Sequence, residues 1–196
     1  MLHDSYIEQL TCLPMRLEQN IIAPIFNEMD IYNRPINLED YKDRKVLIAF
    51  FRHAGCPFCN LRVHYLSKAH ESLKNAGLDM IFFFESKAQV ILRSSFHLGT
   101  SPVPILSDPT KKWYDAYGLE SSGTKSAISH LTSFVQTTFK AKSLGLPVHL
   151  MASGESISTM PAEFLIDKGL IVKRVHYSDR LNDRIEIADI ERFARE

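Results

Sequence analysis

Residues 45–59 read KVLIAFFRHAGCPFC and place a pair of cysteines just after an apolar run. The run Lys45–Phe51 is nearly continuous in apolar and β-prone residues, which is typical of a central parallel strand covered on both faces. From Pro57 to about Asn75 the apolar residues recur at helical spacing, and Gly77 is placed to end that helix. The sequence therefore predicts a strand, a turn that carries both cysteines, and a helix.

The alternation of strands and helices continues along the chain. Parallel pairing is expected where strands are joined through helices, whereas Asp167-Lys168-Gly169 is a tight-turn signal that predicts an antiparallel pair. The expected class is α/β with a mixed central sheet flanked by helices. Further strands are predicted at residues 79–85, 102–106, 161–166 and 170–175, a short hairpin at 30–38 turning at Asn33-Arg34, and helices at 4–19, 87–96, 110–117, 124–144 and 185–193.

Length and composition exclude several classes of protein. The chain has 196 residues, enough for one domain of ordinary size, and its 23 Lys and Arg balance its 23 Asp and Glu. A chain without net charge has no long-range field for nucleic acid or an anionic membrane surface, so small molecules or other proteins are the expected partners. No apolar stretch reaches the ~20 residues that a membrane-spanning helix requires. The first 20 residues lack a signal-peptide pattern, and the three cysteines are too few for a secreted disulfide framework. We expect a cytoplasmic protein.

The cysteine pair predicts reversible thiol and disulfide chemistry. Cys56 falls at the helix N-cap and Pro57 at the first helical position, where unpaired N–H groups and the helix dipole stabilise a thiolate. Cys56 is therefore the expected nucleophile, exposed at the turn. Cys59 lies one turn into the helix, and we expect it to resolve the disulfide formed at Cys56. Arg52 and His53, just upstream, add positive charge or proton transfer near the sulfur.

Other interpretations of the cysteines remain open. Two cysteines at this spacing also form half of a zinc site, which requires two more ligands. His64 and His70 lie on the following helix, away from the stripe that shares a side with the cysteines, so we expect neither a metal nor a cofactor. Cys12 is either a third redox thiol or a buried free cysteine, and the second is commoner.

Two segments together resemble the thioredoxin superfamily, most closely its peroxiredoxin-like branch, the AhpC/TSA-type family. They are Gly55-Cys56-Pro57-Phe58-Cys59 in its strand and helix context, and the later MPAEFLID at residues 160–167 with Gly169. The resemblance covers roughly Pro24 to the end. It implies a thioredoxin-like domain over residues 24–196 with a helical insertion at about 119–159, preceded by an N-terminal helical extension over 1–23. It also implies a cis-proline at Pro161, preceded by Met160, at the start of the strand beside the cysteines.

The sequence departs from the family at three positions. Peroxiredoxins carry a Pro-x-x-x-Thr/Ser-x-x-Cys loop, and here the proline and hydroxyl positions are Ala49 and His53. Arg52 either replaces the arginine that orients peroxide in the family or is a surface guanidinium, the simpler interpretation. Thioredoxins hold a buried Asp where this chain has Phe50. The Pro-Phe dipeptide between the cysteines resembles that of glutaredoxins, which use glutathione.

These features predict a peroxiredoxin-like antioxidant oxidoreductase. Cys56 attacks a peroxide or disulfide, Cys59 resolves it, and Met160, Pro161, Arg52 and His53 shape the substrate groove. A thiol reductant, either a thioredoxin-like protein or glutathione, restores the dithiol. One alternative is a thioredoxin- or glutaredoxin-type disulfide reductase without peroxidase activity, and another is a redox-sensing interaction module. The helix at 124–144 covers the active site, builds a homodimer contact or packs on the core.

Overall fold

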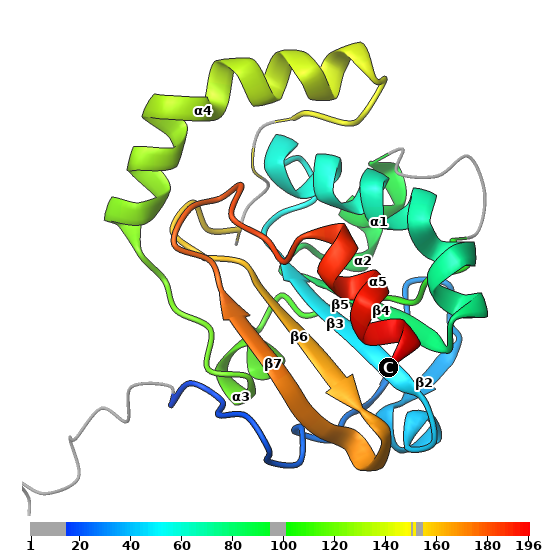
Figure 1. Cartoon of the computed structure of the whole chain (residues 1–196). Coiled ribbons are helices and arrows are strands. Elements are labelled where there is room, and N and C mark those ends of the chain that lie inside the picture. The colour runs from blue at the N-terminus through cyan, green and yellow to red at the C-terminus, as the bar shows by residue number, and fades with distance from the viewer. Residues whose placement is uncertain (1–14, 95–100, 150, 152–154) are drawn as a thin grey trace, which may run out of the picture.

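The computed structural model describes residues 15–94, 101–149, 151 and 155–196, and its centre is a mixed five-stranded sheet. The strand order is β5-β4-β3-β6-β7, so β3 is central (Figure 1). Parallel pairing joins β3 to β4 and β4 to β5, and antiparallel pairing joins β3 to β6 and β6 to β7. The mixed sheet expected from the sequence is confirmed. The strands are β3 (Lys45–Phe51), β4 (Leu78–Phe84), β5 (Ile105–Ser107), β6 (Ala162–Asp167) and β7 (Ile171–Tyr177).

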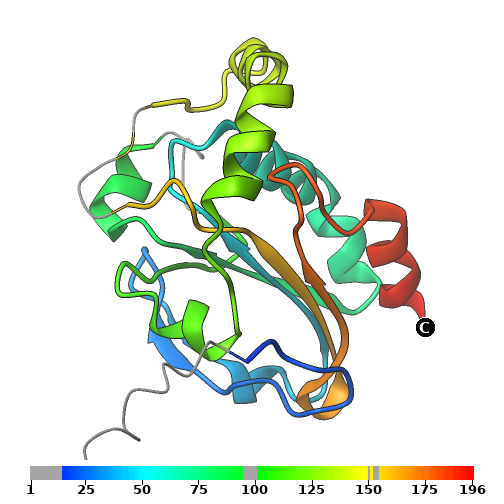
Figure 2. The same cartoon turned by 90° about the vertical axis from the view of Figure 1, so that its left-hand side faces the viewer.

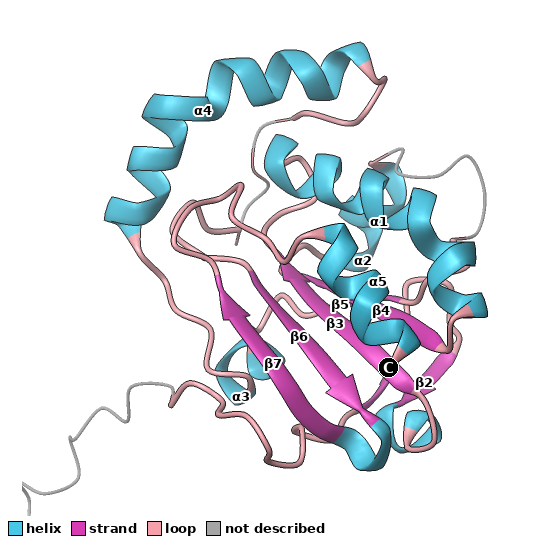
Figure 3. Ribbon diagram, in the orientation of Figure 1, coloured by secondary structure: helices cyan, strands magenta, loops and turns pink. Residues whose placement is uncertain are grey.

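Helices flank this sheet, as the side view and the view coloured by secondary structure make plain (Figures 2 and 3). On one face lie α1 and α5, and on the other lie α3 and the first part of the described chain. The helix α4 stands beyond the end of the sheet at which β3 finishes (Figure 1). The helices are α1 (Pro57–Asn75), α2 (Ala88–Arg93), α3 (Lys112–Ala116), α4 (Gly123–Ser143) and α5 (Ile187–Arg195).

The central strand is apolar throughout because both of its faces are covered. Leu47, Ala49 and Phe51 enter the core that contains the α1 and α5 side chains, whereas Val46, Ile48 and Phe50 enter the core on the opposite face. There Phe50 stacks on Phe83 with ring centroids 4.6 Å apart. Full burial of one such side chain contributes about 1.5–3 kcal/mol, so this strand anchors the fold and fixes the position of the residues that follow it.

Local signals placed the remaining elements with small shifts. A hairpin of β1 (Asn27–Met29) and β2 (Pro35–Asn37) turns at Asn33, whose φ of 60° is the left-handed conformation that Asn tolerates. The strand predicted at residues 102–106 is observed at Ile105–Ser107 instead. Pro102 and Pro104 lack an N–H group for the ladder, so the strand begins after them.

The predicted N-terminal helix is wrong over residues 15–19, which are not helical, and its earlier part with Cys12 lies outside the described residues. The following segment hydrogen-bonds to the start of β7 instead. Asn20 N donates to Val172 O at 2.7 Å, and Ala23 N donates to Leu170 O at 2.9 Å. These backbone bonds satisfy groups that a helix would otherwise pair internally. In the described part of the chain, no helix is long and apolar enough to cross a membrane.

The expected cis-proline is also wrong, since no peptide bond between described residues is cis and Met160–Pro161 is therefore trans. Met160 N donates to Glu120 O at 3.0 Å, and Pro161 O accepts from Ser178 N at 3.1 Å. These two bonds hold the chain as it enters β6. Trans is also the favoured isomer of an X-Pro bond, by about 0.5–1 kcal/mol.

Candidate active site

The two cysteines lie at the junction between the end of β3 and the start of α1, as predicted. Cys56 is the N-cap residue of α1, with φ −72° and ψ 117°, Pro57 is the first helical residue, and Cys59 lies in the first turn. Both thiols are free, and the two residues are only 1% and 0% exposed. The expectation that Cys56 is exposed is therefore wrong.

Residues that follow α4 in the chain lie against the residues around Cys56. Asn60 Nδ2 donates to the Pro147 carbonyl oxygen, and Ser94 Oγ lies 2.8 Å from His149 Nε2. A Cβ on Gly55 would overlap His149, so the close approach of the two chains requires glycine there. The predicted helix at 124–144 is thus followed by a segment that packs against the cysteine motif at Gly55 and Asn60.

Arg52 is a buried partner of the cysteines. It is 0% exposed, and its Nη1 lies 3.9 Å from Cys56 Sγ. Its Nη2 donates to Ile157 O at 2.5 Å, and its backbone N donates to Cys59 Sγ at 3.4 Å. The surface guanidinium expected from the sequence is wrong because the returning chain covers the end of β3 and accepts a hydrogen bond from it.

This environment separates the two thiols in acidity. Burial alone would raise the pKa of Cys56, but the hydrogen bond from the Cys59 thiol, the charge of Arg52 and the backbone N–H groups of Cys59 and Phe58 lower that pKa from 9.0 to about 6. Burial and the neighbouring Cys56 hold the pKa of Cys59 well above its ordinary value. At neutral pH the site therefore holds one thiolate, at Cys56, and one thiol, at Cys59.

His53 lies in a buried network on the loop before Cys56. Its Nδ1 is 3.8 Å from Glu155 Oε2, and its carbonyl oxygen accepts from Cys56 N at 3.1 Å. Glu155 also accepts a hydrogen bond from Ser86 Oγ, which in turn accepts from Ala54 N at 2.8 Å. The network links the loop to Ser86, just after β4, and to Glu155 in the segment that returns to β6.

Of the two other predicted groove residues, Met160 packs in the same buried cluster as both cysteines. Pro161 is buried beside it at the start of β6. Arg52, Cys56 and Cys59 are therefore in direct contact, His53 lies on the adjoining loop, and Met160 belongs to the same core cluster as the cysteines.

A buried ionic cluster behind the cysteines was missed by the sequence analysis. Arg62 on α1 donates from Nε and Nη2 to the two carboxylate oxygens of Glu163 on β6, at 2.7 and 2.8 Å. Arg184 Nε lies 3.7 Å from the same carboxylate. One signal was present: Glu163 is a charged residue inside an otherwise apolar strand run, and a buried carboxylate requires partners.

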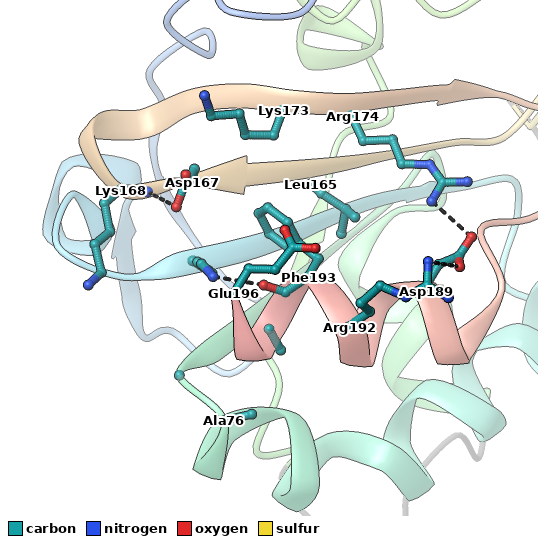
Figure 4. Close-up of a pocket in the computed structure, with 13 residues that line it drawn as sticks. Ala76, Leu165, Asp167, Lys168, Lys173, Arg174, Asp189, Arg192, Phe193 and Glu196 are labelled. Atoms are coloured by element: carbon teal, nitrogen blue, oxygen red, sulfur yellow. Dashed lines mark hydrogen bonds and ion pairs between the residues drawn. The ribbon is translucent and has the colours of Figure 1, made fainter.

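Two pockets formed by described residues bear on the site. One, of about 450 Å³, is lined by α1, α4 and residues 181–187 and includes Phe58 of the cysteine motif; we call it the α1–α4 pocket. The other, of about 610 Å³, lies between the β6–β7 hairpin and α5 and includes Lys45 and Ala76; we call it the α5 pocket (Figure 4). Lys45 begins β3 and Ala76 follows α1, so the α5 pocket lies at the end of both elements opposite the cysteines.

Metal ligation finds no support in the described part of the chain. No group of three or more His, Cys, Asp or Glu side chains there is placed to hold a metal ion.

Comparison with known proteins identifies the relatives of this chain. The family model described as "AhpC/TSA family" matches residues 20–175. "Peroxiredoxin Bcp" of Escherichia coli strain K12 is 30% identical over 77 residues, and "Putative peroxiredoxin bcp" of Shigella flexneri matches equally. Each match covers 39% of this chain and 49% of the relative, so the chain spans about half the length of these curated relatives.

Solved structures share the fold at low sequence identity. Peroxidoxin BcpB of Mycobacterium tuberculosis has a TM-score of 0.64 at 12% identity, over 92% of this chain and 97% of that one. The reduced 2-Cys peroxiredoxin of Plasmodium vivax has a TM-score of 0.62 at 16% identity, over 91% and 80%. The likeness in structure shows the thioredoxin-like fold, and the relationship to the AhpC/TSA family rests on the family model.

Proposed function

The chain belongs to the AhpC/TSA family, a peroxiredoxin-like branch of the thioredoxin superfamily, and from its site we propose that it is a thiol peroxidase that acts through Cys56 and Cys59. The Cys56 thiolate attacks one peroxide oxygen and becomes a sulfenic acid, while the other oxygen leaves as hydroxide or an alkoxide and takes up a proton from solvent to give water or an alcohol. The Cys59 thiol then condenses with the sulfenic acid, which gives the disulfide and releases water. A thiol reductant restores the dithiol.

One observation carries this proposal: a thiol whose pKa is lowered to about 6 lies beside a buried arginine and one helical turn from a second thiol. With that pKa, roughly nine-tenths of Cys56 is thiolate at pH 7, against roughly 1% for an ordinary cysteine. The buried guanidinium of Arg52 also suits an oxygen that gains negative charge as the O–O bond breaks.

The test is rapid-mixing oxidation of the reduced protein by hydrogen peroxide. We expect a single fast phase at Cys56 and a final loss of two thiols per chain. A rate no greater than that of a free thiol of matched pKa would refute peroxidase activity.

A disulfide reductase without peroxidase activity is the second candidate, and one observation favours it. The family's hydroxyl position is occupied by His53, whose ring faces Glu155 at 3.8 Å. Fast reduction of a small disulfide by the dithiol, together with slow oxidation by peroxide, would support this candidate over the first.

A further inference from the structure

The α1–α4 pocket adjoins the cysteine motif and has two facing helical walls. Phe58 lies between the cysteines in sequence, lines this pocket and contacts Phe134 of α4 with ring centroids 6.5 Å apart. Each helix contributes residues at spacing i, i+3, i+4 and i+7, the spacing of one helix face. These residues are Phe58, Leu61, Arg62 and Tyr65 on α1, and Ser133, Gln136, Thr137 and Lys140 on α4.

The α4 wall of this pocket is polar. Its four side chains are two hydroxyls, an amide and an ammonium, whereas Val135 and Phe139 on the same helix are 80% and 76% exposed. Phe134 and Ala141 of α4 pack inward, and the polar side chains that line the pocket lie beside them on the helix. The volume of about 450 Å³ lies in the range of small-molecule sites, so the wall fits a small polar ligand.

Arg184 supplies a buried cation with spare donors at this pocket. Its side chain is 7% exposed, and its Nη1 donates to Ser178 Oγ at 2.9 Å and to Asp183 O at 2.8 Å. Its Nε and Nη2 have no hydrogen-bond partner among the described residues. A buried donor without a hydrogen bond costs about 1–3 kcal/mol, and the residue that bears these two donors lines the pocket.

The charges around Arg184 favour an anion, most of all when the cysteines are oxidised. Arg62 and Arg184 share the single carboxylate of Glu163. The pocket lining also contains one further cation, Lys140, and one carboxylate, Glu186, so cations outnumber carboxylates by one. Burial raises the pKa of Cys59, and Arg184 is one of the charges that oppose this rise, so its field reaches the sulfurs. Formation of the disulfide removes the Cys56 thiolate and leaves the surroundings of Arg184 more positive.

We propose that the α1–α4 pocket binds a carboxylate-bearing low-molecular-weight thiol, the reductant of the Cys56–Cys59 disulfide, through Arg184 and Lys140. The thiolate of a first molecule attacks Cys56 Sγ, the bond to Cys59 breaks, and Cys59 leaves as a thiolate that takes up a proton. The thiolate of a second molecule attacks the sulfur of the first, and Cys56 leaves as a thiolate. Two thiols thus become one disulfide, two electrons pass to the protein, and one proton is released.

This inference rests on the proposed function only for the origin of the disulfide, so the test separates the two. The protein is oxidised with hydrogen peroxide or, if peroxide fails and the proposed function with it, with diamide. The disulfide form is then mixed with N-acetylcysteine or with its uncharged amide, and the rates are compared per thiolate. We expect the carboxylate thiol to react at least about tenfold faster, equivalent to 1.4 kcal/mol, with a rate that saturates.

Two substitutions on α4 provide the matched comparison. Lys140→Gln removes a cation that lines the pocket, and Lys142→Gln removes an exposed cation of the same helix that does not. We expect the preference for the carboxylate thiol to fall several-fold in the first and to stay in the second. Arg184→Gln should abolish the preference, and because Arg184 is buried, Lys140→Gln keeps the test valid if that variant does not fold.

Equal rates for the two thiols in the unsubstituted protein would overturn the inference. Equal preferences in the Lys140→Gln and Lys142→Gln variants would do the same. So would efficient reduction by a thioredoxin-like protein with no preference between the two small thiols, because the reductant would then be a protein.

Discussion

The two ends of β3 and α1 each carry a pocket rich in charged residues, yet of the two only the cysteine end has buried guanidinium nitrogens without a hydrogen-bond partner among the described residues. At the α5 pocket, Arg174 and Arg192 both pair with Asp189 at 3.0 Å, and Lys45 donates to Phe193 O at 2.8 Å (Figure 4). At the cysteine end, Arg52 Nε and two nitrogens of Arg184 are buried without a hydrogen-bond partner among the described residues. In the larger pocket, no lining residue is among those with a buried side-chain nitrogen or oxygen that lacks a hydrogen-bond partner.

The difference indicates which end of the two elements carries the chemistry. Unpaired buried donors cost stability, so a fold keeps them where they have another use. At the cysteine end they accompany a thiol whose pKa is lowered to about 6. In this molecule, a lowered thiol pKa next to buried nitrogens without hydrogen-bond partners marks the candidate site better than pocket volume does.

Loss of the Cys56 sulfur should reduce turnover more than any other change at either end. In Cys56→Ser, we expect peroxide and disulfide turnover to fall by at least about 10³-fold, the scale on which a catalytic nucleophile acts. Turnover is measured with hydrogen peroxide and with a small disulfide. The matched variant Cys59→Ser should still consume one equivalent of peroxide and stop at the sulfenic acid. Full turnover in Cys56→Ser with both substrates would end the claim that this end is the active site.

Carboxylate-to-amide substitutions at the two ends compare their electrostatics directly. In Glu163→Gln the buried Arg62 and Arg184 lose their shared anion, and the free energy of unfolding should fall by about 3–5 kcal/mol. In Asp189→Asn the partners are half-exposed, so water replaces the lost contacts and the midpoint of unfolding should hardly move. Urea unfolding of both variants is the measurement. Equal losses at the two ends would contradict the distinction between them.

Arg52→Met should shift the pH dependence of the site by a smaller amount. Without the guanidinium, the pKa of Cys56 rises, so the pH at which peroxide oxidation becomes fast moves upward. The rate at pH 7 should fall several-fold and recover only in part by about pH 9, because the thiolate then forms without help but no guanidinium faces the leaving oxygen. Rates are measured from pH 5 to pH 9 by rapid mixing. Arg192→Met, at the α5 pocket, is the control and should leave the profile in place; a shift of equal size there would show a general charge effect.

Local patterns made most of the fold predictable. The apolar run at Lys45–Phe51 and the helical stripe after Pro57 each specify an element without help from distant residues. One prediction failed where distant contacts decide: residues 15–19 are not helical, and the following Asn20 and Ala23 bond to the start of β7. The other failed where the chain keeps the ordinary preference, since the Met160–Pro161 bond is trans, the favoured isomer.

The candidate site was predictable in its sulfurs and less so in its charges. The spacing of Cys56 and Cys59, with Pro57 between them and a strand and a helix on either side, predicts a redox pair. The burial of Arg52 depends on the returning chain near Ile157, over 100 residues later, and no local pattern contains that contact. Arg184 is similar, because its side chain lies beside Glu163 of β6, and no local pattern contains that contact.

The most direct test of the account is a titration of Cys56 in the reduced protein. The rate of Cys56 alkylation by iodoacetamide is followed against pH, with mass spectrometry to assign the modified residue. Because only the thiolate reacts, the rate should rise through a midpoint near pH 6 and level off by pH 7, while Cys59 stays unmodified. A midpoint near 9, the ordinary value for a cysteine, would contradict the claim that the cysteine end of this fold is built to hold a thiolate.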